Sequence, residues 1–132
     1  MMRYLLDTNF VIAVLNKRSD LAVSRLAAMR VGTVLSAIVM HELAFGAYNS
    51  RDPIANLRRV HALGLPILQL TASDAIQAGQ IRAALKRLGT PIGHYDVLIA
   101  GQAVARGLTL VTNNTGEFAR VEGLRLEDWA AD

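Results

Sequence analysis

The chain has 132 residues, which is enough for one domain with a sizeable core and too few for two. Apolar residues make up 52% of it, so a disordered chain is excluded, and no apolar run approaches the roughly 18 residues that span a membrane. The absence of cysteine excludes disulfides and thiolate metal sites and is compatible with a cytoplasmic protein. The net charge of +3 favours a polyanionic partner such as nucleic acid.

Short apolar runs that predict β-strands alternate with longer helical patterns along the whole chain. Most of the runs are continuously apolar, as in strands that are covered on both faces of a parallel sheet. The five runs lie at residues 4–6, 33–36, 67–70, 108–112 and 124–126. Parallel strands joined through helices predict an α/β fold, a three-layer α/β/α sandwich around a four- to five-stranded parallel sheet. We expect it to form a single domain over residues 1–132.

The helical segments between these runs carry start and stop signals. Asp52 directly precedes a proline, which predicts a capped helix start, and the segment from Thr71 to Asp74 resembles a capping box. The helix that follows is expected over 72–88, and Gly89 then ends it. Apolar residues at helical spacing predict its buried face: Ala72, Ile76, Gly79, Ala83 and Leu88.

Three of the eleven acidic residues lie in apolar segments. Asp7 follows the first strand, Glu42 lies on the apolar stripe of a helix expected over Ala37–Tyr48, and Asp96 begins a helix expected over 95–106 that is apolar nearly all round. Desolvated carboxylates are costly, and several together repel one another unless a cation neutralises them. Because basic residues are scarce in these segments, a hard divalent cation with oxygen ligands is the simplest resolution.

Each acid also has a purely structural interpretation. Asp7 could cap the helix that starts near Asn9, Asp96 could favour the positive end of its own helix, and Glu42 could be a solvated edge residue. The polar loop 112–118 follows the fourth strand, at the sheet edge where ligands gather in α/β folds. It could supply amide and hydroxyl ligands, or it could be a turn with an asparagine cap.

Five segments together resemble a known family. They comprise Leu6-Asp7-Thr8-Asn9, Glu42, the run 79–100 with Gly93-His94-Tyr95-Asp96, the run 111–118 with Thr112-Asn113-Asn114 and Glu117-Phe118, and Leu126-Glu127-Asp128-Trp129. In this order and over essentially the whole chain, they are similar to the PIN-domain ribonucleases, and specifically to the VapC toxins of bacterial toxin–antitoxin pairs.

The resemblance implies a metal-dependent endoribonuclease that cleaves RNA, often a tRNA or a ribosomal RNA loop. It also implies a cognate antitoxin of the VapB type that silences the enzyme, and a homodimer. Matched position by position, Asp7, Glu42 and Asp96 are the acids of the family motif and bind magnesium or manganese, with Glu42 acting through water. As an alternative role, Glu42 could orient the attacking water as a base.

Other residues of the same motifs would support this catalytic site. Thr8 and Thr112 match hydroxyl positions of the family, and Asn9 completes the first motif. Asn114 falls where many members have a fourth aspartate, and a neutral amide is a weaker ligand for a hard cation. This departure leaves the number of bound metals open between one and two.

Basic and aromatic residues give further candidates for contact with RNA or with a partner. Arg82, Lys86 and Arg87 share one amphipathic segment and could contact backbone phosphates or the antitoxin. His94 and Tyr95 flank Asp96 and could stack on an unpaired base, although packing at the helix start is the favoured interpretation.

Two other functions compete with the nuclease. A phosphatase that uses Asp7 as its covalent nucleophile also places an aspartate after the first strand, but such enzymes have Asp-x-Asp there, and position 9 is asparagine. A catalytically silent module could use the acids only to dock a basic partner. Docking alone does not require acids from three separated segments, so the nuclease is favoured.

Overall fold

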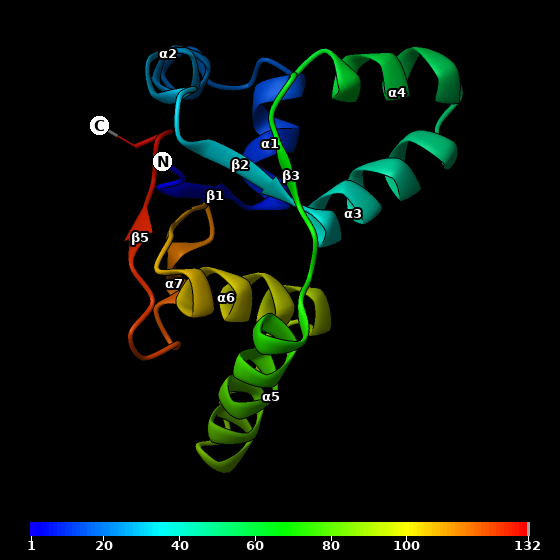
Figure 1. The fold of residues 1–132 in the computed structure, drawn as a ribbon. Helices are drawn as coiled ribbons and strands as arrows, with labels where there is room; N and C mark the ends of the chain where they lie inside the picture. The colour runs from blue at the N-terminus through cyan, green and yellow to red at the C-terminus, as the bar shows by residue number, and fades with distance from the viewer. Residues whose placement is uncertain (132) are drawn as a thin grey trace.

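The computed structural model describes residues 1–131. Within them the chain forms β1 (Tyr4–Leu6), α1 (Thr8–Leu15), α2 (Asp20–Met29), β2 (Thr33–Ser36), α3 (Ala37–Tyr48), α4 (Pro53–His61), β3 (Ile67–Leu68), α5 (Ala72–Arg87), α6 (His94–Arg106), β4 (Thr109–Val111), α7 (Thr115–Phe118) and β5 (Leu126–Glu127). Figure 1 shows the strands between two groups of helices, α1 to α4 on one side and α5 and α6 on the other. The predicted α/β sandwich is confirmed.

All strand pairs in the sheet are parallel, in the order β3-β2-β1-β4-β5. The central strand β1 pairs with β2 on one side and with β4 on the other. From β1 the chain adds β2 and then β3 on one side of the sheet. It then crosses to the other side of β1, where it adds β4 and β5, so the order of the strands reverses between β1 and β4. Such a reversal opens a crevice at the carboxyl ends of the two strands, and ligands of parallel α/β sheets bind there.

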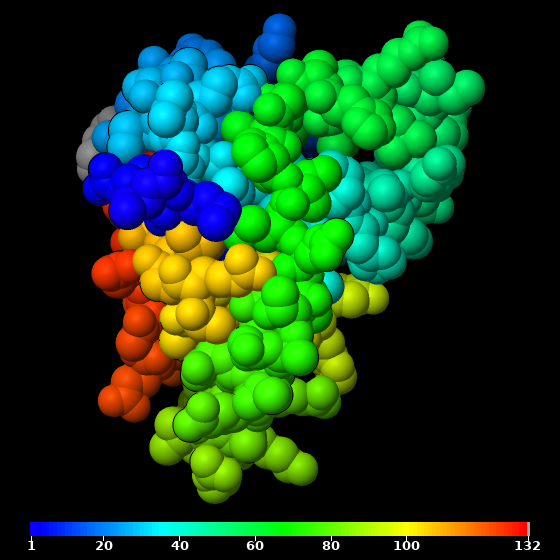
Figure 2. Space-filling model, viewed as in Figure 1, coloured from blue at the N-terminus to red at the C-terminus, as the bar shows by residue number. Residues whose placement is uncertain are grey.

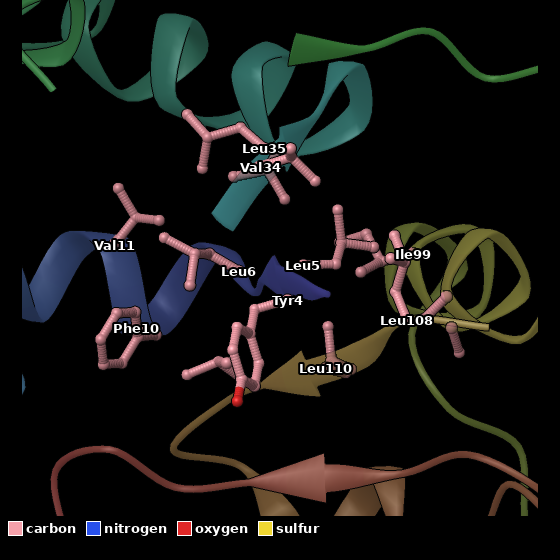
Figure 3. Close-up of a cluster of buried hydrophobic side chains, with 14 of the residues drawn as sticks. Tyr4, Leu5, Leu6, Phe10, Val11, Val34, Leu35, Ile99, Leu108 and Leu110 are labelled. Atoms are coloured by element: carbon pink, nitrogen blue, oxygen red, sulfur yellow. The ribbon is translucent and has the colours of Figure 1, made fainter. Parts of the chain in front are cut away.

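The core forms around β1 because all three of its side chains are buried. Leu5 and Leu6 are fully enclosed, and Figure 3 shows them among side chains of β2, α1, α6 and β4. The ring of Trp129, beyond β5, packs edge-on against Tyr4 at 5.0 Å and against Phe10 of α1 at 5.7 Å between centroids. The tail of the chain is thereby anchored to its first strand, since each aromatic pair of this kind adds about 0.5–1.5 kcal/mol beyond burial.

The start and stop signals act as their sequences predict. The Asp52 carboxylate accepts a hydrogen bond from the Ala55 amide at the start of α4, and Thr71 and Asp74 form a reciprocal capping box on α5. Gly107 ends α6 in the left-handed conformation, with φ of 66°, which a residue without Cβ adopts at little cost. Local chemistry therefore sets these helix ends.

The bounds of three strands differ from the prediction, and the first of them is β4, which is Thr109–Val111 rather than 108–112. β3 ends at Leu68 rather than at residue 70, and β5 occupies Leu126–Glu127 rather than 124–126. Both are edge strands with one partner each, so their length depends on how far that partner runs alongside them.

The predicted buried face of α5 is wrong. Ile76 and Leu88 are 74% and 72% exposed, and the residues that face the core are Asp74, Ala78, Ile81 and Leu85. The physical reason is the way α5 packs on α6, where the backbone of Gly101 lies directly against Ala78. In Figure 2 the far end of α5 projects at the bottom of the molecule, away from the sheet.

We expect Gly101→Ala to destabilise the fold strongly, because its Cβ would lie 2.5 Å from the Ala78 Cβ and 2.6 Å from two backbone atoms of Ala78. Overpacking of this kind costs about 1–3 kcal/mol, measured as the free energy of unfolding in urea. Gly79→Ala on α5 is the matched control, since its Cβ would meet no atom within 4 Å. It is expected to stabilise the helix by about 0.5–1 kcal/mol, and an equal loss in both variants would contradict the close crossing.

Candidate active site

Asp7 lies at the reversal point between β1 and β4. Its backbone amide donates to the Val111 carbonyl at 2.8 Å, which extends the pairing of β1 with β4 by one step. Its carboxylate Oδ2 accepts a hydrogen bond of 2.8 Å from Thr112 Oγ1, the first residue after β4. The side chain is 2% exposed and forms no capping hydrogen bond with α1, although Asp7 is its N-cap residue. Asp7 is therefore a buried acid presented by the sheet, and helix capping does not account for its burial.

Glu42 reaches the same edge from α3. It is half-buried, and its Oε1 accepts a hydrogen bond of 2.8 Å from Thr8 Oγ1, one residue after Asp7. The expected apolar stripe around Glu42 is only partly buried, because Phe45 is 66% exposed. Glu42 instead lies on the rim of a groove between α1, α3 and α4. A single threonine from α1 orients its carboxylate.

Asp96 enters from the first turn of α6 and is half-buried. Burial, and then the charges of Asp7, Glu117 and Glu42, raise its pKa to about 6. The pKa of Asp7 is raised as well: burial is the largest cause, the hydrogen bond from Thr112 opposes it, and the charge of Glu42 adds to it. The carboxylates of Asp7, Glu42, Asp96 and Glu117 therefore lie close enough for their charges to shift pKa values within the group. The sequence predicts this cluster for the first three.

Glu117 is a member of this cluster that sequence reasoning did not select. Its Oε2 accepts a hydrogen bond of 2.7 Å from Asn114 Nδ2, and its Oε1 accepts one of 3.1 Å from the Gly93 amide. The backbone amide of Asn114 in turn donates to Thr112 Oγ1 at 2.9 Å. The signal was present in the sequence: Glu117 lies three residues after Asn114 and so falls on the same side of the short helix α7.

The carboxylates have only neutral hydrogen-bond donors. Within residues 1–131 the one ion pair joins Arg106 to Asp74, with no part in the cluster. Nor do any three acidic or histidine side chains of these residues converge into a ready-made metal site. The donor chemistry nevertheless suits a hard divalent cation, since buried carboxylates with raised pKa values and hydroxyl neighbours supply oxygen ligands and lack a compensating positive charge.

The basic and aromatic candidates lie beside the cluster. Arg82 and Lys86 of α5 line a hollow together with His94 at the start of α6, and Arg87 is exposed on the last turn of α5. Tyr95 is 47% exposed, and its ring lies 5.3 Å from the ring of His41 on α3. Within residues 1–131 none of these side chains hydrogen-bonds or forms an ion pair with an acid of the cluster.

The acids gather at the carboxyl ends of β1 and β4, where the strand order of the parallel sheet reverses. The chain therefore has the form of an α/β domain that binds its ligand at this edge of the sheet. The model of the PIN domain matches residues 4–124. The chain belongs to the PIN-domain family, within its VapC branch, because relatives at 30% identity or more span nearly its whole length.

Among these relatives is the tRNA(fMet)-specific endonuclease VapC of Salmonella typhimurium, 41% identical over 98% of this chain and 99% of the relative. The protein of the same name from Shigella flexneri is 39% identical over 98% of this chain and 100% of the relative. A solved structure of DNA-bound VapBC from Salmonella typhimurium superimposes with a TM-score of 0.94 at 41% identity, covering 98% of this chain and 99% of that one. No helix within residues 1–131 has the length and apolar character needed to cross a bilayer.

The raised pKa of Asp96 makes the metal-free protein less stable as the pH rises. The folded state holds the proton up to a pH of about 6, whereas the unfolded chain releases it near the ordinary value of 3.8. The stabilising effect of that proton is therefore complete below pH 3.8 and is lost as the pH rises through 6. In EDTA we expect Asp96→Asn to be more stable than the wild type by about 1–2 kcal/mol at pH 7.5, with little difference at pH 4. Urea titrations at both pH values check this, and a gain that is independent of pH would contradict it.

Proposed function

We propose that this chain is a divalent-metal-dependent endoribonuclease and the toxin of a toxin–antitoxin pair. The observation that carries the proposal is the cluster of carboxylates at the carboxyl edge of the sheet, which forms no ion pair with a basic residue among residues 1–131. The names of the similar proteins, ribonuclease VapC and tRNA(fMet)-specific endonuclease VapC, support RNA as the substrate and tRNA as the class of RNA.

Asp7 and Asp96 are the proposed ligands of Mg²⁺ or Mn²⁺, with Glu42 completing the set through water. A cation bound there would neutralise charge on the phosphate and lower the pKa of a coordinated water. Thr112 orients the Asp7 carboxylate through its hydrogen bond to Oδ2, which leaves Oδ1 as the candidate ligand atom. Asn114 donates to Glu117, so in this arrangement the nitrogen of its amide serves to hold that acid.

Glu42 is the candidate for moving a proton. Thr8 holds one of its oxygens at 2.8 Å, so the other, Oε2, would be directed at an attacking water and accept its proton. A cation held by Asp7 and Asp96 would place that water beside Glu42 and offset the negative charge around it.

Arg82, Lys86 and Arg87 are the proposed contacts for RNA backbone phosphates. Arg82 and Lys86 lie on the hollow that adjoins the start of α6, so a strand held there would pass close to the helix turn that carries Asp96. Each phosphate contact of this kind would make RNA binding weaker as the salt concentration rises.

A groove beside Glu42 is the proposed docking place of a VapB-like antitoxin. It has a volume of about 260 Å³, and its walls are mostly apolar side chains of α1, α3 and α4: Ile12, Leu15, Leu43, Ala47 and Val60. Two of the solved structures that superimpose on this chain are of VapBC, from Salmonella typhimurium and Haemophilus influenzae, which supports a protein partner. A peptide in this groove would reach the acidic cluster past Glu42.

A homodimer is part of the same proposal. Exposed large apolar side chains are available for it, namely Phe45 and Tyr48 on α3 and Ile76 on α5.

We expect Asp7→Asn to lose RNA cleavage by on the order of 10²–10³-fold or more while the protein stays folded, because the substitution removes the charge and keeps the shape. The measurement is sequencing of RNA 5′ ends after incubation of total RNA with wild-type or variant protein in magnesium. Glu122→Gln, which changes an exposed acid outside the cluster, is the control and should cleave like the wild type. Cleavage by purified Asp7→Asn at the wild-type sites would disprove the proposed roles of the acids.

We expect Mn²⁺ or Mg²⁺ to raise the melting temperature of the wild type by about 2–5 °C when the ion is present well above its dissociation constant, since binding to the folded state alone stabilises it. Asp7→Asn should show no such rise. A control melt in sodium chloride at the same ionic strength measures the effect of charge screening on the melting temperature, so that the rise due to specific metal binding can be separated from it. An equal shift in wild type and variant would place the ion elsewhere.

A further inference from the structure

Gly93 lies against the carboxylate of Asp96. It is the N-cap residue of α6, three positions before that acid. A Cβ added to Gly93 would lie 2.9 Å from Asp96 Oδ2 and 3.4 Å from its Cγ, and the first distance is shorter than Cβ atoms normally come to an oxygen to which they are not bonded. The Asp96 carboxylate therefore fills the space that a side chain at residue 93 would need.

The backbone gives no reason for glycine at this position. The φ and ψ of Gly93, −56° and 151°, lie in the region open to every L-amino acid. Its amide donates to Glu117 Oε1, and any residue except proline would keep that donor. As an N-cap, serine or aspartate would hold α6 better than glycine does. What distinguishes glycine here is the missing side chain.

The segment before α6 is held from two sides, so it is not the part that would move. Glu117 of α7 accepts from the Gly93 amide, and Arg120 donates to the Pro91 carbonyl at 3.1 Å. By contrast, the atoms that a new Cβ would meet belong to the end of one side chain, and none of them is backbone. A side chain at residue 93 would therefore displace the Asp96 carboxylate and leave the fold in place.

We propose that Gly93 is a positioning residue, whose lack of a side chain keeps open the space in which the Asp96 carboxylate faces the other acids. The inference rests on the proposed function in one respect, namely that cleavage needs Asp96 in this position. Its geometric part, that a Cβ at residue 93 moves the carboxylate, holds whatever the domain cleaves.

Two substitutions separate positioning from helix capping. Gly93→Ala and Gly93→Ser both add a Cβ, but serine is a good N-cap residue and alanine a poor one. We expect both variants to lose at least about 10-fold in kcat/KM for RNA cleavage, mainly in kcat, because a displaced acid acts on the reacting atoms. Gly79→Ala on α5 is the control, since its Cβ would meet no atom within 4 Å and the residue lies outside the acidic cluster, and it should cleave like the wild type. Full activity in Gly93→Ser with a loss in Gly93→Ala would show that capping matters, and would overturn the proposal.

Mn²⁺ affinity, measured by calorimetry, gives a readout that does not depend on catalysis. In an otherwise wild-type protein, Gly93→Ser should weaken Mn²⁺ binding by about 10-fold or more. In an Asp96→Ala background it should have no further effect, because the displaced group is already absent. An equal effect in both backgrounds would overturn the proposal.

Crystal structures of the wild type and Gly93→Ser test the geometric part alone. We expect the Asp96 carboxylate to be rotated away from its wild-type position while the backbone of 91–96 stays in place. An unmoved carboxylate would overturn the inference even if RNA cleavage fell. If the wild-type protein cleaved no RNA in Mg²⁺ or Mn²⁺, the proposed function would be refuted. The role of Gly93 in placing the Asp96 carboxylate would then be tested by the crystal structures alone.

Discussion

Mutual repulsion among Asp7, Glu42, Asp96 and Glu117 is the constraint on which the rest of the site depends. The parallel sheet delivers Asp7 at the end of β1 and Thr112 at the end of β4, while α3, α6 and α7 begin near the same edge. The donors that hold these carboxylates are hydroxyls and amides, which orient an acid without cancelling its charge. The fold thus tolerates a local excess of negative charge, which adds to the effect of burial in raising the pKa values of Asp7 and Asp96.

Elsewhere the same chain treats a buried acid differently. Asp74 is fully buried, and it is bound by the Arg106 guanidinium, by Gln102 and by the amide of Thr71, so its pKa is lowered despite its burial. This network ties the start of α5 to the end of α6, where it stabilises the helix pair. The contrast shows that pairing an acid with arginine was within reach of this sequence, and that the active-site edge has no such pair among residues 1–131.

Prediction from the sequence succeeded where the signal is local. The strand cores, the caps at Asp52 and Thr71 and the acids next to apolar runs all follow from neighbouring residues. It failed where the outcome depends on long-range packing. The buried face of α5 is decided by Gly101, more than twenty positions away, and the burial of Asp74 by Arg106. Glu117 was missed although its spacing from Asn114 is a local signal, because an acid on a short polar helix resembles a solvated one and its second partner, Gly93, comes from another segment.

The order in which the chain is synthesised bears on when such a site exists. Asp7 is made 105 residues before Thr112, whose hydroxyl orients it, and the ring that packs against Tyr4 belongs to the still later Trp129. Since β4 also pairs directly with β1, the central strand lacks one of its two neighbours until that late part of the chain has emerged. A growing polypeptide on the ribosome therefore carries Asp7 and Glu42 long before it carries the strand and the hydroxyl that complete their surroundings.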